Sequence, residues 1–137
     1  MRISWMGAVC LVSACGAVQA ECDPGAEVAR EFVSGYALRQ EPAMVHIGRS
    51  TLVTESFKQS FSTAAMSRAS DTDPVLGTQA VPSAVKVATC DAKSPWVTLA
   101  AADGSAFKVT VKVLNTPQGW RVDGAGAVNM PARAVAR

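Results

Sequence analysis

The sequence predicts an α+β domain whose N-terminal helices pack on one face of a curved antiparallel sheet of about four strands. Between residues 23 and 70, apolar side chains recur at helical spacing. Beyond residue 84, short β-branched and aromatic segments alternate with turn residues. Helices followed by consecutive strands are typical of layered α+β domains, because parallel βαβ folds interleave the two.

The first predicted helix begins at Asp23-Pro24. Asp can accept hydrogen bonds from free amides at a helix start, and proline is harmless in the first turn. Val28, Phe32 and Tyr36 then recur every four residues and form one apolar stripe. The pattern predicts a helix that ends near Gln40.

Two further helices are expected before residue 71. A break at residues 41–42 precedes a short helix that runs through Ile47. Ser50 or Thr51 can cap a third helix, in which apolar residues keep a period near 3.6. This helix should end near Ser70, because a proline follows at position 74.

The second half of the chain reads as an antiparallel meander. The segment 107–113 alternates strictly between apolar and polar residues, which is typical of a strand with one buried face. The predicted strands are Val85–Val87, Trp96–Ala102, Phe107–Leu114 and Trp120–Val122. Trp120 alternates with Val122 and is expected in the core.

Two registers compete at the turn near Gly104. A two-residue loop sets Leu99 opposite Lys108, whereas a three-residue loop sets Leu99 opposite Phe107 and gathers the apolar residues on one face. We expect the second register, with Gly104 in the left-handed conformation. In this register Trp96 lies beside Thr110 and near Lys112.

Residues 1–20 read as an export signal, with an apolar stretch after Arg2 and small residues at Val18 and Ala20. Cleavage before Glu21 would leave a single domain over 21–130 and a flexible tail over 131–137. A second interpretation is a lipoprotein box at 12–16, in which Cys15 is lipidated. The expected location is therefore the periplasm or the exterior, with an outer-membrane anchor if Cys15 carries a lipid.

The charge and the cysteine content of the chain argue against several classes of function. Without the signal, 12 basic and 11 acidic residues remain, so nothing favours a nucleic-acid or anionic-membrane partner. Cys22 and Cys90 also remain, and two cysteines in a small exported domain usually form a disulfide. We expect this bridge, because neither a Cys-x-x-Cys pair nor a neighbouring histidine suggests redox or metal chemistry.

Three segments carry a family resemblance. They are a helix with Phe32 and Tyr36, the loop Asp71-x-Asp73-Pro74-x-Leu76-x-x-Gln79, and the ending Gly119-Trp120-Arg121-Val122-Asp123. Together they resemble a family of small bacterial envelope domains of unknown function. That family is similar to the nuclear transport factor two-like superfamily, also described as a cystatin-like cone. The resemblance implies helices packed into the concave face of a bent sheet, but the superfamily hosts enzymes, binding proteins, scaffolds and immunity proteins.

No residue pattern predicts a catalytic, metal or cofactor site. Asp71 and Asp73 precede a proline and are expected to set a turn or cap a helix. His46 is the only histidine, and we expect it to be solvated on a short helix without an orienting partner. No nucleophile elbow or phosphate loop is present.

The most informative candidates lie on the polar face of the predicted sheet: Trp96, Lys108, Thr110 and Lys112. An aromatic side chain among lysines is typical of a protein interface, although Trp96 could equally cover the core edge or the disulfide. We therefore expect a non-catalytic exported domain that contacts another envelope or secreted protein. One such role is an immunity or inhibitor protein against a cell-wall-targeting effector. The alternative is a small-ligand-binding or enzymatic protein that uses the cone interior.

Overall fold

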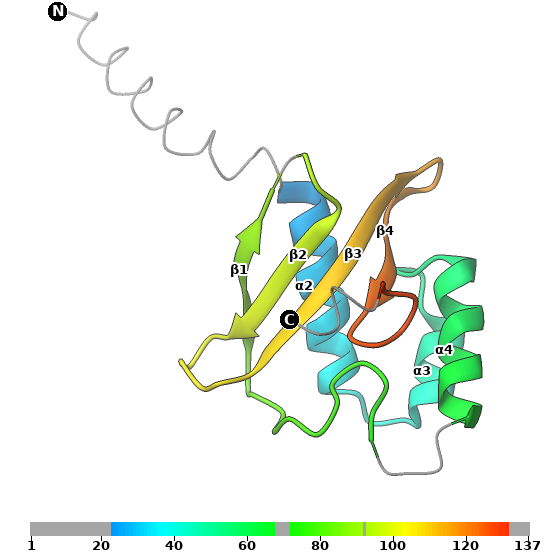
Figure 1. The fold of residues 1–137 in the computed structure, drawn as a ribbon, viewed down its shortest axis with the longest axis horizontal. Coiled ribbons are helices and arrows are strands. Elements are labelled where there is room, and N and C mark those ends of the chain that lie inside the picture. The colour runs from blue at the N-terminus through cyan, green and yellow to red at the C-terminus, as the bar shows by residue number, and fades with distance from the viewer. Residues whose placement is uncertain (1–22, 68–71, 92, 132–137) are drawn as a thin grey trace, which may run out of the picture.

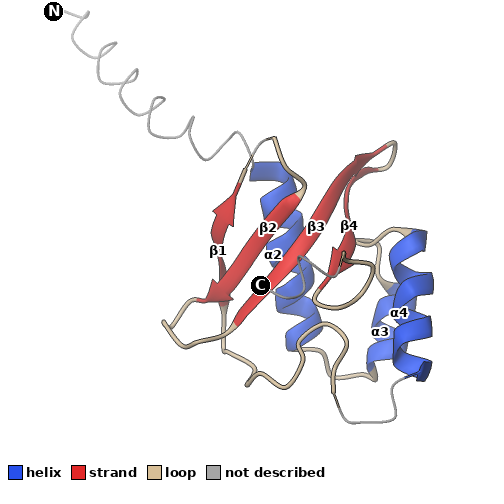
Figure 2. Cartoon of the chain, viewed as in Figure 1, coloured by secondary structure: helices blue, strands red, loops and turns tan. Residues whose placement is uncertain are grey.

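The computed structural model describes residues 23–67, 72–91 and 93–131, and it confirms the α+β class. Within these residues, three helices accompany a four-stranded antiparallel sheet of order β1-β2-β3-β4, which is not closed (Figures 1 and 2). The predicted signal segment with Cys15, the cysteine Cys22, Asp71 and residues 132–137 lie outside the described residues. The helices are α2 Asp23–Ala37, α3 Ala43–Arg49 and α4 Glu55–Ser67; the strands are β1 Val85–Cys90, β2 Trp96–Ala101, β3 Lys108–Thr116 and β4 Gly119–Ala125.

Helix α2 contacts all four strands of the sheet (Figure 1). Its stripe is buried as its spacing predicts, with Phe32 and Tyr36 almost fully enclosed. Gly25 allows a close approach to β4, because a Cβ there would lie 3.1 Å from the ring of Trp120. Trp120 therefore packs on α2. The sequence predicts it in the core, but it is only partly buried and packs against the core from outside.

Helix α4 contacts β4, and α3 contacts α4 and α2 (Figure 2). Helix α4 brings Phe57 and Phe61 onto the α2 stripe, where Phe32 meets Phe57 edge-on at 5.5 Å and Tyr36 meets Phe61 edge-on at 6.1 Å. Such edge-to-face aromatic pairs add to the stabilisation that burial itself provides. The core is thus filled by rings at the junction of α2 with α4.

The predicted start of α4 is wrong by about four residues. Thr54 caps the helix, since its Oγ1 accepts the Phe57 amide at 3.0 Å, and neither Ser50 nor Thr51 does so. Residues 52–54 instead pair with β4: Thr54 N–H donates to the Val122 carbonyl at 2.9 Å, and Val122 N–H donates to the Leu52 carbonyl at 2.7 Å. This tertiary pairing holds residues 52–54 in an extended conformation, so the helix begins only at Glu55.

The register between β2 and β3 differs from the prediction by two residues. Leu99 lies opposite Val109 rather than Phe107, and Trp96 lies opposite Lys112 rather than Thr110. The reason is a longer connection, in which the Asp103 carboxylate accepts the Ser105 amide at 2.9 Å and holds an extra turn. A slip of two leaves every side chain on its predicted face.

Further details of the sheet concern one turn, two bulges and the segment after β4. Gly104 has φ of +85°, so its predicted left-handed conformation is confirmed. A bulge between Val87 and Thr89 interrupts β1, and a second between Lys112 and Val113 interrupts the pairing of β3 with β4. Beyond β4 the chain turns back, and Val128 bonds to Ala125 and is buried in the core.

Candidate functional site

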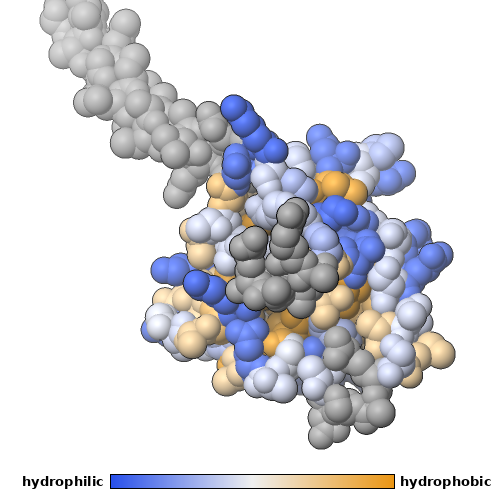
Figure 3. Space-filling view, viewed as in Figure 1, coloured by the Kyte–Doolittle hydropathy of each residue, from blue (hydrophilic) through white to orange (hydrophobic). Residues whose placement is uncertain are grey.

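The side chains that point away from α2 form what we call the outer sheet face, which includes Lys86, Thr89, Trp96, Thr98, Lys108, Thr110 and Lys112. Strand alternation separates these residues from the buried set of each strand. Lys86 lies opposite Ala100, which in turn lies opposite Lys108, so one row across three strands carries a lysine at each end. Figure 3 views the molecule from this side, where hydrophilic side chains lie among less polar ones.

All four residues predicted as an interface lie on the outer sheet face. Lys108 is exposed, whereas Trp96, Thr110 and Lys112 are half-buried. The corrected register brings Trp96 directly opposite Lys112, closer than the sequence predicts. The structure thus brings the predicted set together and adds Lys86, which the alternation of β1 places on the same face.

Lys112 also has a partner within the chain. Its Nζ lies 3.3 Å from the carboxylate of Asp123, which is buried in the bulge of β4. The same carboxylate accepts the Thr54 hydroxyl at 2.6 Å. A buried carboxylate without partners costs free energy, so the contact with Asp123 holds Lys112 in place within the fold. Lys108 and Lys86 are then the exposed cations of the outer sheet face.

A second cluster of polar groups lies where α2 ends. The hydroxyl of the buried Tyr36 donates to the Asp73 carboxylate, 3.0 Å from each oxygen. Arg39 lies over the Tyr36 ring at 4.3 Å, donates to the Tyr36 carbonyl at 2.7 Å, and approaches Asp73 to 3.5 Å. Arg39 Nε is buried and has no hydrogen-bond partner among the described residues.

The predicted turn role of Asp73 is confirmed. One oxygen of its carboxylate accepts the amides of Val75 and Leu76 at 2.8 and 2.9 Å, which holds the turn that follows. Sequence reasoning did not find its contact with Tyr36, because the two residues lie 37 positions apart.

His46 is not the isolated, solvated residue that the sequence suggests. Its Nδ1 lies 2.9 Å from the Glu41 carboxylate, and its ring contacts the edge of Tyr36 at 6.0 Å between centroids. The hydrogen bond with His46 is the largest influence that lowers the pKa of Glu41. The pair therefore fixes an ionised carboxylate beside the end of α2.

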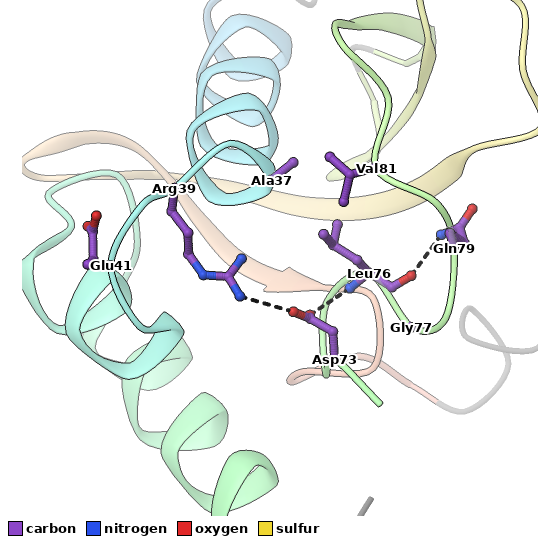
Figure 4. Close-up of a pocket in the computed structure, with 8 residues that line it drawn as sticks. All are labelled: Ala37, Arg39, Glu41, Asp73, Leu76, Gly77, Gln79 and Val81. Carbon is purple, nitrogen blue, oxygen red and sulfur yellow. Dashed lines mark hydrogen bonds and ion pairs between the residues drawn. The ribbon is translucent and has the colours of Figure 1, made fainter. Parts of the chain in front are cut away.

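An open pocket of about 360 Å³ lies against this cluster (Figure 4). Arg39, Glu41 and Asp73 supply its charged groups, and Figure 4 shows the Arg39 guanidinium directed at Asp73. Apolar side chains complete it on the side away from Glu41, where Figure 4 draws Ala37, Leu76 and Val81. The sequence gives little signal for it, since the segment after Gln79 is rich in small residues.

Tyr36 is expected to resist ionisation in alkaline solution. Burial raises its pKa first, and the nearby Asp73 charge raises it further. Above pH of about 10 the unfolded chain then loses this proton while the folded chain keeps it, so the free energy of unfolding should fall by about 1.4 kcal/mol per pH unit. Tyr36 is the only tyrosine, so phenolate absorbance reports on it alone during an alkaline titration.

The matched variant Tyr36→Phe should lose this part of the pH dependence, although it forfeits a hydrogen bond worth about 1 kcal/mol. Circular dichroism followed in parallel shows whether the fold persists. A phenolate signal that develops near pH 10 in protein that is still folded would contradict the assignment.

Within the described part of the chain, no three His, Cys, Asp or Glu side chains gather as metal ligands would. The helices described there also lack the length and apolar content needed to cross a bilayer. The Cys22–Cys90 pairing is not tested, because Cys22 lies outside the described residues. Comparison with known proteins adds no family, since no family model, curated protein or solved structure matches this chain.

Proposed function

We propose that this chain is an exported, non-catalytic binding domain that contacts another envelope or secreted protein through the outer sheet face. The observation that carries the proposal is the placement of Trp96 among the lysines of that face, where Lys86 and Lys108 are exposed at the two ends of one row. Tryptophan is enriched among the residues that dominate binding energy, and half-buried rings of this kind can enter a partner's cavity.

The chemistry of the face defines the partner. Two exposed ammonium groups favour a surface rich in carboxylates, and this attraction should weaken with salt. Three threonines, Thr89, Thr98 and Thr110, lie opposite one another between the lysine row and Trp96 and offer hydrogen bonds without further charge. The proposed partner therefore presents an acidic rim around an apolar cavity.

The proposal includes export of the chain and a disulfide between Cys22 and Cys90. Cys90 ends β1 and packs against the core side of the sheet, where α2 lies, and α2 begins at Asp23, one residue after Cys22. Figure 1 shows the start of α2 and the end of β1 at the same end of the sheet. This proximity supports the bridge, and a bridge favours the periplasm or the exterior.

The proposal also extends to a cone-shaped arrangement, a more specific role and a lipid anchor. The contacts of α2 with every strand support the cone-shaped arrangement of the nuclear transport factor two-like superfamily. Within the binding class, an immunity or inhibitor protein against a cell-wall-targeting effector fits the compartment and size. Lipidation of Cys15 would anchor the same domain to the outer membrane.

Photo-crosslinking in the native cells tests the interface. A photoreactive residue at Trp96 should give a discrete adduct with one envelope or secreted protein, whereas the same residue at the exposed Gln59 of α4 should not. Trp96→Ala and Lys108→Glu should then weaken binding of the identified partner by tenfold or more. Equal adducts from Trp96 and Gln59, or undiminished binding by both variants, would refute the proposed surface.

A second candidate function, small-ligand binding, is favoured by one specific observation. The pocket beside Tyr36 contains Arg39, whose buried Nε has no partner among the described residues. Catalysis there is a weaker proposal, because the Asp73 carboxylate is already engaged by Tyr36, Arg39 and two backbone amides.

A further inference from the structure

We propose that the pocket at the end of α2 binds a small zwitterion of amino-acid type, with its carboxylate on Arg39, its ammonium on Glu41 and an apolar side chain against Leu76 and Val81. This inference rests on the second candidate function, small-ligand binding, and not on the outer sheet face. It extends that function by naming the chemical class of the ligand.

Arg39 provides the anion-binding end. A guanidinium has five N–H donors in a planar fork that matches a carboxylate. Within the described chain Arg39 uses one donor on the Tyr36 carbonyl and one in the looser approach to Asp73, while Nε has no partner. Contact with the Tyr36 ring holds the fork in place. Nε is buried, and the N–H groups of Nη1 and Nη2 that these two contacts leave unused are the donors available to a ligand that enters the pocket.

Glu41 provides the cation-binding end. Its side chain is about one-third exposed, and the hydrogen bond to His46 fixes its position beside the pocket. A lone anion would meet repulsion from this carboxylate, and a lone cation would meet repulsion from Arg39. A ligand that carries both charges satisfies both ends, whereas Asp73 is already engaged within the fold.

The volume and the apolar wall set the size of the ligand. At about 360 Å³ the pocket is at the small end of ligand sites, which suits an amino acid or a dipeptide rather than a large cofactor. Leu76 is buried, and Val81 is 50% exposed and available to cover a ligand. Figure 4 shows both side chains and Ala37 on the opposite side of Arg39 from Glu41.

Three probes of one shape test the charge pattern on the purified full chain. Leucine carries both charges, 4-methylpentanoate lacks the ammonium, and leucinamide lacks the carboxylate. Titration by calorimetry or by amide chemical shifts should show saturable binding of leucine, with each of the other two probes weaker by about tenfold or more. Glu41→Gln should remove the difference between leucine and 4-methylpentanoate while leaving leucinamide the weakest of the three.

Two bulky variants test the location. Val81→Trp fills the pocket and should abolish leucine binding, whereas Leu114→Trp, at a comparably exposed apolar position on β3, should not. Tight binding of either single-charge probe would overturn the zwitterion while leaving small-ligand binding intact. Absence of saturable binding by all three probes, or leucine binding that survives Val81→Trp, would overturn both, and neither outcome bears on the outer sheet face.

Discussion

The proposed Cys22–Cys90 bridge is expected to contribute roughly 4 kcal/mol to the free energy of unfolding. The two cysteines lie 68 positions apart, so the bridge would close most of the domain into one loop and reduce the conformational freedom of the unfolded chain. A domain of this size has about 5–15 kcal/mol of total stability, so the loss is a large fraction of it. Urea denaturation of the oxidised protein with and without reductant measures the difference.

Three variants separate the bridge from packing at Cys90. Cys22→Ser removes the bridge alone, Cys90→Ala removes the bridge and a half-buried side chain, and the double variant should be no less stable than Cys90→Ala. Strict additivity of the two single variants would argue against a shared bond. Reaction of both cysteines with a thiol reagent in protein recovered from the periplasm would refute the bridge directly.

Gly126→Ala is expected to destabilise the fold by about 2–5 kcal/mol. Gly126 has φ of +60°, and a Cβ there would overlap the carbonyl oxygen of Val75 and lie 2.8 Å from the Val75 Cα. The neighbouring amide of Ala127 donates to the Pro74 carbonyl at 3.0 Å, so the backbone cannot retreat without breaking this contact. Thermal or urea unfolding of the variant provides the measurement.

Gly77→Ala is the matched control for backbone strain. Gly77 has a similar φ of +66°, but a Cβ there would meet no atom within 4 Å. The control should therefore show only the cost of a left-handed alanine, about 1–2 kcal/mol. Equal destabilisation by the two substitutions would show that strain alone, and not the close approach to Val75, explains the requirement for glycine at position 126.

The helical and strand segments could be predicted because each depends on its own periodicity. The failures occur where distant residues decide the local structure. Ser50 and Thr51 resemble a cap upstream of an apolar stripe, yet pairing of residues 52–54 with Val122 keeps that segment extended and places the cap at Thr54. Nothing in the spacing of that segment reports on a partner almost 70 residues later.

In the sheet, the predicted faces of the strands are correct and the predicted pairing between strands is not. Alternation fixed the faces, so Trp96, Lys108, Thr110 and Lys112 do share one surface even though the pairing is shifted by two residues. The shift itself depends on how many residues the turn at Asp103 consumes, and turn chemistry allowed more than one length.

The pocket could not be derived from the sequence in the same way. Asp73 was correctly assigned to a turn from the proline that follows it, but its partners Tyr36 and Arg39 come from the end of another element. The one available signal was an arginine in the last turn of the first predicted helix, in a chain that also carries an aspartate before a proline in a later loop. Such a signal becomes specific only once the tertiary fold places the two segments together.

The two edges of the sheet differ in their tendency to pair with another chain. Residues 52–54 bond to β4 and occupy its margin, whereas β1 is the last strand on the other side among the described residues. A strand with unpaired amides and carbonyls can template growth by further copies of the same chain. The bulge after Val87 and the exposed charge of Lys86 interrupt that template, so we expect β1 to resist pairing with further copies of the chain.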